Sequence, residues 1–238
     1  MSADPVLTTD RLVVGRSRQP LLPAVDVAVR PGELWAVLGR NGSGKSTLLR
    51  TLARVLRPVS GTVERRRGLR VSWVGQRTAI DTTVPARCRD VVRSGLSTGW
   101  RFAVPLLGSS AVDEALALAD ATALANARFH ELSEGQKQRV LLATAIVSDP
   151  ELLLLDEPAS AMDAASERHL FDVLDRVRAD RRTAVVLVSH HVDLTVARAT
   201  HGIFVDADAA VVATGPIDVV AAAPAFRHRY ALPDEPCA

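Results

Sequence analysis

The chain has 238 residues, of which 47% are hydrophobic and 24% are charged, and its formal net charge is +2 at pH 7. These values describe a globular chain long enough for one large α/β domain, and they exclude an intrinsically disordered protein and a broadly basic surface for nucleic acid. The longest apolar-rich tract, residues 207–226, is broken by aspartates, a glycine and prolines, so it does not qualify as a membrane span.

The N-terminal segment, residues 1–10, lacks the apolar stretch of a secretory signal, so we expect the protein to stay in the cytoplasm. Cys88 and Cys237 lie far apart with no metal-ligand spacing around them, and we expect both to be free thiols in a reducing compartment. Because the longest apolar-rich tract does not qualify as a membrane span, any link to a membrane is expected to come through a partner.

Short strand-like runs separated by turn signals occur in residues 11–38 and 60–77, and they predict an antiparallel β lobe. Residues 65–68 read Arg-Arg-Arg-Gly and lie at one of these turns. A single short charge run without interleaved aromatic residues favours a solvated hairpin tip over a nucleic-acid contact.

Residues 39–47 form a glycine-rich turn that follows the apolar run 34–38 and opens an apolar-periodic segment. Its glycines permit positive backbone dihedrals, so that successive N–H groups and a helix N-terminus converge on phosphate oxygens. Lys45 adds a positive charge toward the β and γ phosphates, and the Ser46 hydroxyl is placed to bind Mg²⁺. We assign the following residues of this loop to nucleotide binding: Gly39, Asn41, Gly42, Gly44, Lys45, Ser46 and Thr47.

From residue 84 to about residue 127 the apolar spacing becomes helical, which predicts a helical subdomain inserted into the chain. Residues 132–136 then read Leu-Ser-Glu-Gly-Gln and begin a further helical pattern. Ser133 and the Gly135 backbone would lie at a helix N-terminus, where unbonded N–H groups and the helix dipole favour an anion.

Residues 151–158 read Glu-Leu-Leu-Leu-Leu-Asp-Glu-Pro, and the four leucines are typical of a strand buried on both faces. In open α/β sheets ligands collect at the carboxyl ends of the strands. We therefore expect Asp156 to approach the Mg²⁺ ion and Glu157 to act as the general base toward the attacking water.

The motif at residues 132–136 resembles the signature motif of ATP-binding cassette (ABC) ATPases, usually Leu-Ser-Gly-Gly-Gln, with Glu134 in place of the first glycine. The phosphate loop and the acidic strand flank it in the family's order. The resemblance implies that Ser133, Gly135 and Gln136 contact the γ-phosphate of ATP bound by the opposite subunit.

Three further residues acquire roles from the same resemblance. Gln76 corresponds to the glutamine that senses Mg²⁺ and the lytic water, and Asp163 to the aspartate that helps to couple the two sites of a dimer. His190 corresponds to the switch histidine that contacts the γ-phosphate, whereas His191 beside it is expected to be structural.

One expected residue is missing. ABC ATPases usually place an aromatic side chain ahead of the phosphate loop to stack on adenine, but Arg16 stands at this position, 23 residues before Gly39. Its guanidinium plane could stack on the base, or it could be a solvated arginine at a strand end. We expect weak discrimination between ATP and GTP.

The resemblance implies an α/β fold with a phosphate-loop NTPase core, a mostly parallel sheet, an antiparallel β lobe and an inserted α-helical subdomain. Residues 1–238 would form one ABC ATPase domain, with its core at about 1–83 and 140–238 and its helical subdomain at about 84–139. The stretch 79–107, with Trp100 and Phe102, is the expected docking surface for a permease. Burial of these two aromatic residues inside the subdomain is the alternative.

The implied activity is ATP hydrolysis that powers transport through separate integral membrane permease subunits, with ATP and Mg²⁺ as cofactors. Two copies of the chain would close head to tail on two MgATP molecules. An importer is expected, with resemblance to importers of metal chelates, a substrate-binding protein in the complex and no nucleic acid. The ATPase would be cytoplasmic and peripheral on the inner face of the membrane. A soluble ABC ATPase of iron–sulfur cluster assembly is the alternative.

Overall fold

The computed structural model describes residues 3–17, 19–75, 86–96, 109–159 and 163–230. The chain divides into two compact units, each with its own core. The first comprises residues 1–67 and 186–238, and the second comprises residues 68–185. The expectation of a helical subdomain bounded at residues 84 and 139 stays a prediction.

The first unit contains an antiparallel three-stranded sheet in the order β4-β1-β6. The buried Thr9 hydroxyl strengthens it, because its Oγ1 donates to Val25 O at 2.8 Å and accepts from Val27 N at 2.9 Å. The predicted antiparallel lobe is confirmed for these three strands, whereas residues 34–38 and 71–74, which lie within the predicted ranges, form strands that pair in parallel. The strands of this lobe and of the small hairpin beside it in sequence are β1 (Leu7–Val13), β2 (Gly15–Arg16), β3 (Gln19–Pro20), β4 (Ala28–Val29) and β6 (Ser60–Arg65).

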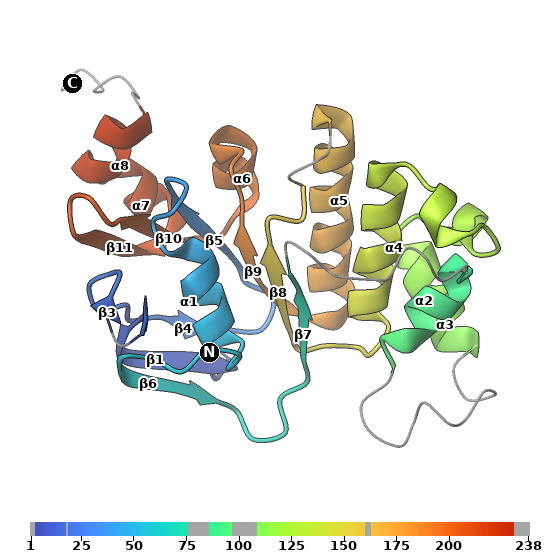
Figure 1. Cartoon of the computed structure of the whole chain (residues 1–238), viewed down its shortest axis with the longest axis horizontal. Helices are drawn as coiled ribbons and strands as arrows, with labels where there is room; N and C mark the ends of the chain where they lie inside the picture. The colour runs from blue at the N-terminus through green and yellow to red at the C-terminus, as the bar shows by residue number, and fades with distance from the viewer. Residues whose placement is uncertain (1–2, 18, 76–85, 97–108, 160–162, 231–238) are drawn as a thin grey trace. The chain divides into compact units, whose positions relative to one another are not determined.

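The other strands of the first unit include one parallel and one antiparallel pair. In β5 (Leu34–Gly39) every residue is buried, as expected for a strand covered on both faces. It pairs in parallel with β10 (His201–Asp206), with Val205 opposite Gly39, and β11 (Val211–Pro216) lies antiparallel on the other side of β10. Figure 1 shows α7 and α8 beside β10 and β11. The helices of this unit are α1 (Lys45–Leu52), α6 (Val192–Arg198), α7 (Ile217–Ala222) and α8 (Pro224–Tyr230).

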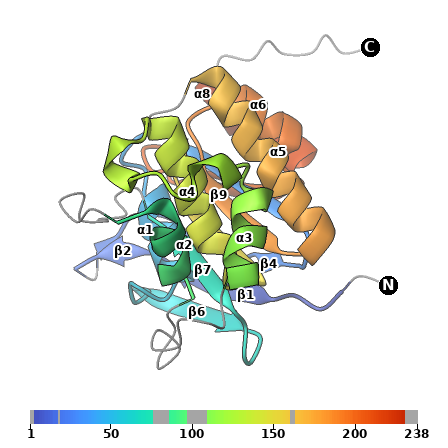
Figure 2. The ribbon, with the colours of Figure 1, turned by 90° about the vertical axis from the view of Figure 1, so that its right-hand side faces the viewer.

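The second unit pairs β7 (Val71–Val74) in parallel with β8 (Leu152–Asp156) and adds a helical cluster. Figure 2 shows α2, α3 and α4 packed side by side, which confirms the inserted helical part of the fold. The strand β9 (Ala184–Val188) crosses the boundary between the units at Val186. The helices are α2 (Cys88–Ser94), α3 (Ser109–Leu118), α4 (Glu134–Ile146) and α5 (Ala164–Arg181), with short 3₁₀ turns η2 (Thr122–Leu124) and η3 (Phe129–Glu131).

Two smaller expectations can be compared with the structure. Cys88 in α2 is a buried free thiol, and burial raises its pKa; Cys237 lies outside the described residues. Residues 65–68 do not form a hairpin tip, because β6 and β7 pair with different strands. Arg66 and Arg67 are exposed as expected, whereas the Arg65 guanidinium donates to Leu52 O at the C-terminal end of α1.

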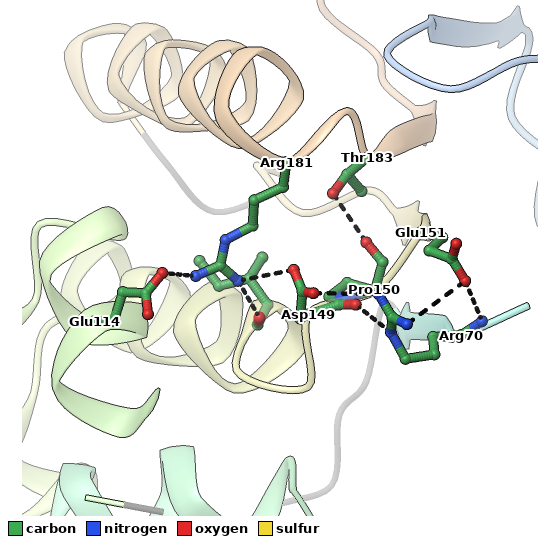
Figure 3. Close-up of polar contacts among 8 residues, drawn as sticks. Arg70, Glu114, Asp149, Pro150, Glu151, Arg181 and Thr183 are labelled. Carbon is green, nitrogen blue, oxygen red and sulfur yellow. Dashed lines mark hydrogen bonds and ion pairs between the residues drawn. The ribbon is translucent and has the colours of Figure 1, made fainter. Parts of the chain in front are cut away.

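An ion-pair network supports the end of α5 within the second unit (Figure 3). The Arg181 side chain is only 14% exposed; it donates to Ile146 O at 3.0 Å and forms ion pairs with Glu114 and Asp149. Asp149 also accepts from Arg70 at 3.1 Å. A single guanidinium thus joins α3, the last turn of α4 and the connection to β8.

The same connection is also held by hydrogen bonds between side chains and the backbone. The Thr183 hydroxyl donates to Pro150 O at 2.9 Å, and Arg70 N donates to a Glu151 carboxylate oxygen at 3.2 Å. The start of β8 is therefore anchored before the strand enters the core.

We expect Arg181→Leu to lower the free energy of unfolding by about 1–3 kcal/mol, because Ile146 O loses its side-chain donor and two carboxylates lose a largely buried partner. Urea denaturation measures this change. The control is Arg168→Leu, which alters an exposed arginine of the same helix and should shift stability by less than about 0.5 kcal/mol. Equal effects of the two variants would contradict the assigned role of Arg181.

Candidate active site

The phosphate loop begins where β5 ends, at Gly39, and closes at the first turn of α1. Gly39 has φ 148°, and a Cβ built on it would lie 2.2 Å from Val205 O of the neighbouring strand, so no other residue fits there. Gly44 has φ 97° and is the N-cap of α1, whose first turn holds no acidic residue. The loop therefore leads directly into a helix N-terminus whose positive dipole end is not neutralised by an acidic residue of the first turn.

Lys45 lies inside this loop and is only 4% exposed. Its Nζ donates to Gly39 O and to Arg40 O, both at 2.8 Å. The buried Ser43 Oγ makes no hydrogen bond with the described residues. Close backbone approach, an ammonium group and a buried hydroxyl that no described residue binds form a cradle that fits an oxyanion such as a polyphosphate.

The two acidic residues lie at the C-terminal end of β8, as predicted. Asp156 is fully buried and is the last residue of the strand. Glu157 follows with φ 54°, in the left-handed region that few residues other than glycine adopt. Such a strained backbone at a strand end is common at functional sites, and it turns the glutamate away from the strand direction.

The signature residues form the N-terminal cap of α4. Ser133 Oγ accepts from Gln136 N at 3.3 Å, and Gln136 Oε1 accepts from Ser133 N at 3.0 Å, so the two side chains complete a capping box. Glu134, the residue that departs from the family's glycine, pairs with Lys137 Nζ at 2.7 Å. Sequence reasoning missed this pair, although the spacing of three residues on a helix could have indicated it.

Asp163 caps the next helix, α5, by accepting from Ser166 N at 2.7 Å. This hydrogen bond lowers the pKa of the Asp163 carboxyl, so the group stays ionised at neutral pH. A Cβ built on Gly135 would lie 3.3 Å from Ser166 Oγ, so the beginnings of α4 and α5 adjoin within the second unit. A cavity of about 240 Å³ lies between the two helices.

His190 and His191 lie between β9 and α6 in the first unit, and both are exposed. Ser189 Oγ accepts from the backbone N–H of His191 at 3.1 Å, and the structural role expected for the His191 side chain stays a prediction. Arg16 is exposed in the β2–β3 hairpin. The chain then leads to Leu22, whose side chain lies 3.3 Å from a Cβ built on Gly44, so the segment after this hairpin reaches the phosphate loop.

The predicted site residues thus fall into two groups. The phosphate loop, Arg16 and His190 belong to the first unit, whereas the acidic residues, the signature motif and Asp163 belong to the second. Gln76 lies outside the described residues, as does most of the proposed docking stretch, including Trp100 and Phe102. The roles assigned to these side chains stay predictions.

Two of the predicted donors, taken one by one, have the chemistry of Mg²⁺ ligands. The described residues hold no cluster of three or more His, Cys, Asp or Glu side chains placed for a metal ion. Nucleotide-bound Mg²⁺ takes one or two protein oxygens together with phosphate oxygens and water, rather than an all-protein cage. A hydroxyl from Ser46 and a carboxylate from Asp156 are donors of this kind.

A strand, a glycine-rich loop with an inserted lysine, and a helix in direct succession define a phosphate-loop nucleotide-binding protein. The family model described as "ABC transporter" matches residues 22–160, more than half of the chain. The chain belongs to this family and is an ABC ATPase of the transporter type. None of the described helices is long and apolar enough to cross a membrane.

Relatives and solved structures agree with this assignment. The zinc import ATP-binding protein ZnuC of Ruegeria pomeroyi is 40% identical over 226 residues, which is 95% of this chain and 84% of the relative. ZnuC of Cereibacter sphaeroides is 37% identical over 94% of this chain and 88% of the relative. A metal-chelate type ABC transporter in an inward-facing conformation matches with a TM-score of 0.84 and 28% identity, over 96% of this chain and 90% of that one.

We expect Arg16→Ala to raise the KM values for ATP and GTP by a similar factor of about two to five, because any stacking of the guanidinium is equally available to both bases. The wild type should hydrolyse the two nucleotides with kcat/KM values within about tenfold of each other. Steady-state kinetics with both nucleotides measure these values, with Arg57→Ala as the control at an exposed arginine. Strong preference for ATP together with no loss in Arg16→Ala would refute this role.

Proposed function

We propose that this chain is the ATP-hydrolysing subunit of a zinc importer. The observation that carries the proposal is the similarity to zinc-import ATPases along nearly the whole chain. The match to a metal-chelate type transporter is consistent with a metal cargo. The proposed partners are integral membrane permease subunits and a substrate-binding protein, with the ATPase on the cytoplasmic face of the membrane.

The mechanism uses the residues as follows. The loop amides and Lys45 bind the β and γ phosphates, and Ser46 with Asp156 would hold Mg²⁺, which when bound neutralises phosphate charge. Glu157 accepts a proton from the attacking water, and the electron pair of the water oxygen attacks the γ-phosphorus as the bond to the bridging oxygen breaks. His190 and Gln76 are assigned to orient the γ-phosphate and the water.

The second copy of the chain completes each site in this proposal. The N-terminus of α4, shaped by the Ser133–Gln136 cap, would face the γ-phosphate held by the other copy, where its N–H groups stabilise negative charge. Asp163, ionised at the start of α5, would couple the two sites. ATP binding then closes the dimer, and hydrolysis removes the contact that both copies share.

We expect Glu157→Gln to bind MgATP without hydrolysing it and therefore to accumulate as a closed dimer. Size-exclusion chromatography with light scattering should show the mass of the Glu157→Gln protein doubling in MgATP, but not in MgADP. Glu64→Gln, a change at an exposed glutamate of β6, should retain hydrolysis and remain monomeric. An unchanged monomer of Glu157→Gln in saturating MgATP would count against the dimer mechanism.

The partner is identified by the same variant. Tagged Glu157→Gln protein purified with MgATP from detergent-solubilised membranes should bring with it a multi-helix permease, which mass spectrometry detects. Recovery only from the cytosol together with iron–sulfur assembly proteins would replace the transport function with the soluble alternative and leave the ATPase mechanism intact.

The cargo is tested with the wild-type complex reconstituted in lipid vesicles. We expect uptake of Zn²⁺ that depends on ATP and on the substrate-binding protein, measured with radioactive zinc. Lys45→Ala in the same complex should abolish uptake, because phosphate binding is lost. Transport of a ferric chelate in place of zinc would overturn the zinc assignment, although not the role of the chain as a transport ATPase.

A further inference from the structure

The helix α8 lies near β10 within the first unit (Figure 1), and its aromatic residues contact Phe204 of that strand. Phe226 is fully buried and meets Phe204 at a centroid distance of 5.3 Å in an edge-to-face arrangement. Tyr230 contacts both rings, at 4.7 Å from Phe226 and 6.2 Å from Phe204. This cluster fixes the end of α8 beside the strand that pairs with β5.

Tyr230 lies beside the part of β10 that pairs with the end of β5. Its ring contacts Phe204, which is opposite Leu38 in the register of β10 and β5, one residue before Gly39. Burial raises the pKa of Tyr230, while the Gly39 backbone acts in the opposite direction. Tyr230 is the only tyrosine of the chain, and Gly39 is the residue at which β5 turns into the loop.

A second connection from α8 reaches the same part of the loop. Arg229 Nε lies 3.3 Å from Asp206 Oδ2, and a terminal nitrogen of Arg229 lies 3.6 Å from Asp208 Oδ2. Asp208 Oδ2 also accepts from Arg40 Nη1 at 2.8 Å. The turn that carries these aspartates is shaped by Asp206 Oδ1, which accepts from Asp208 N at 3.1 Å and from Ala209 N at 3.2 Å.

Both connections lead to the two residues that Lys45 also binds from within the loop, Gly39 and Arg40. Lys45 holds the carbonyl groups of Gly39 and Arg40, Asp208 holds the side chain of Arg40, and Tyr230 packs on the strand beside Gly39. The loop borders a cavity of about 260 Å³, lined by residues 40–43 and 206–208. The ion pair between Asp208 and Arg40 joins the two segments that line this cavity.

We propose that Tyr230 and Arg229 are positioning residues for nucleotide binding: α8 holds the first turn of the phosphate loop in its binding conformation, directly at Gly39 and through Asp208 at Arg40. The inference rests on the proposed nucleotide site. Neither residue touches the substrate. Their effect is to order Gly39 and Arg40 before binding, so that the nucleotide does not have to order them.

This role predicts an effect on affinity rather than on turnover. Tyr230→Phe keeps the aromatic cluster and removes only the hydroxyl, and Asp208→Asn removes the charge shared by Arg40 and Arg229. Each should raise the Kd for MgATP by about three- to tenfold, the range of one hydrogen bond or ion pair, and leave kcat within about twofold. Asp208→Glu keeps the carboxylate and should largely restore the affinity.

The experiment measures MgATP binding by calorimetry, hydrolysis by steady-state kinetics and stability by urea denaturation on the full chain. Asp218→Asn, at an exposed aspartate of α7, is the matched control and should leave the Kd unchanged. Hydrogen exchange at the amides of Gly39 and Arg40 should be faster in Tyr230→Phe and Asp208→Asn than in the wild type.

The outcomes separate this inference from the proposed function. A wild type that does not bind MgATP would overturn the nucleotide site and the inference together. A wild type that binds, with an unchanged Kd in both Tyr230→Phe and Asp208→Asn, would overturn the inference alone. A fall in kcat that follows the loss of stability, without a rise in the Kd, would show that α8 has only a structural role. That result would also refute the inference.

Discussion

The turn at Gly39 is the constraint on which the first unit depends. β5 must run beside β10 until Gly39 lies opposite Val205, and there the chain leaves the sheet so close to Val205 O that a Cβ would be 2.2 Å away. The register of the two strands therefore fixes where the phosphate loop starts. The position of Lys45 follows, because the ammonium group is held by the two carbonyl groups at that turn.

In the second unit, the predicted site residues lie where a strand ends or a helix begins. Glu157 adopts a left-handed backbone directly after a fully buried strand. Ser133 and Asp163 both cap helices, so their side chains are held by backbone N–H groups of the first helical turn. Each group is oriented by bonds within a few residues of itself, so its geometry varies little with the rest of the unit.

The same locality explains how much could be predicted from the sequence. The phosphate loop, the acidic strand end and the cap of α4 depend on short segments, and residue type with spacing was enough to identify them. The split into parallel strands, an antiparallel lobe and a helical part followed from hydrophobic periodicity and family order. The roles of Gln76 and His190 rest on resemblance, since neither a glutamine nor a histidine after a strand has a distinctive local pattern.

What the sequence could not indicate depends on contacts between distant segments. Arg181 finds partners on α3, α4 and the loop before β8, and no spacing relates Glu114 to Asp149. The turn at residues 65–68 was misread as a hairpin because local turn signals do not reveal which strand β6 and β7 pair with. Likewise Asp208 pairs with Arg40 of the loop, and Tyr230 packs on Phe204, because β10 runs beside β5.

These distant contacts affect how the binding energy of the nucleotide is used in the proposed cycle. Arg181 and Thr183 anchor the entry to β8, which ends one residue before the proposed base, Lys45 holds the start of the phosphate loop, and α8 is proposed to do the same. Groups that are ordered before the substrate arrives lose little conformational entropy on binding. In the proposed cycle, binding energy from the γ-phosphate then remains available for the closure of two chains around the nucleotide. This ordering before binding suits a transport ATPase. Binding energy that is used to order the loop is not available to move the permease.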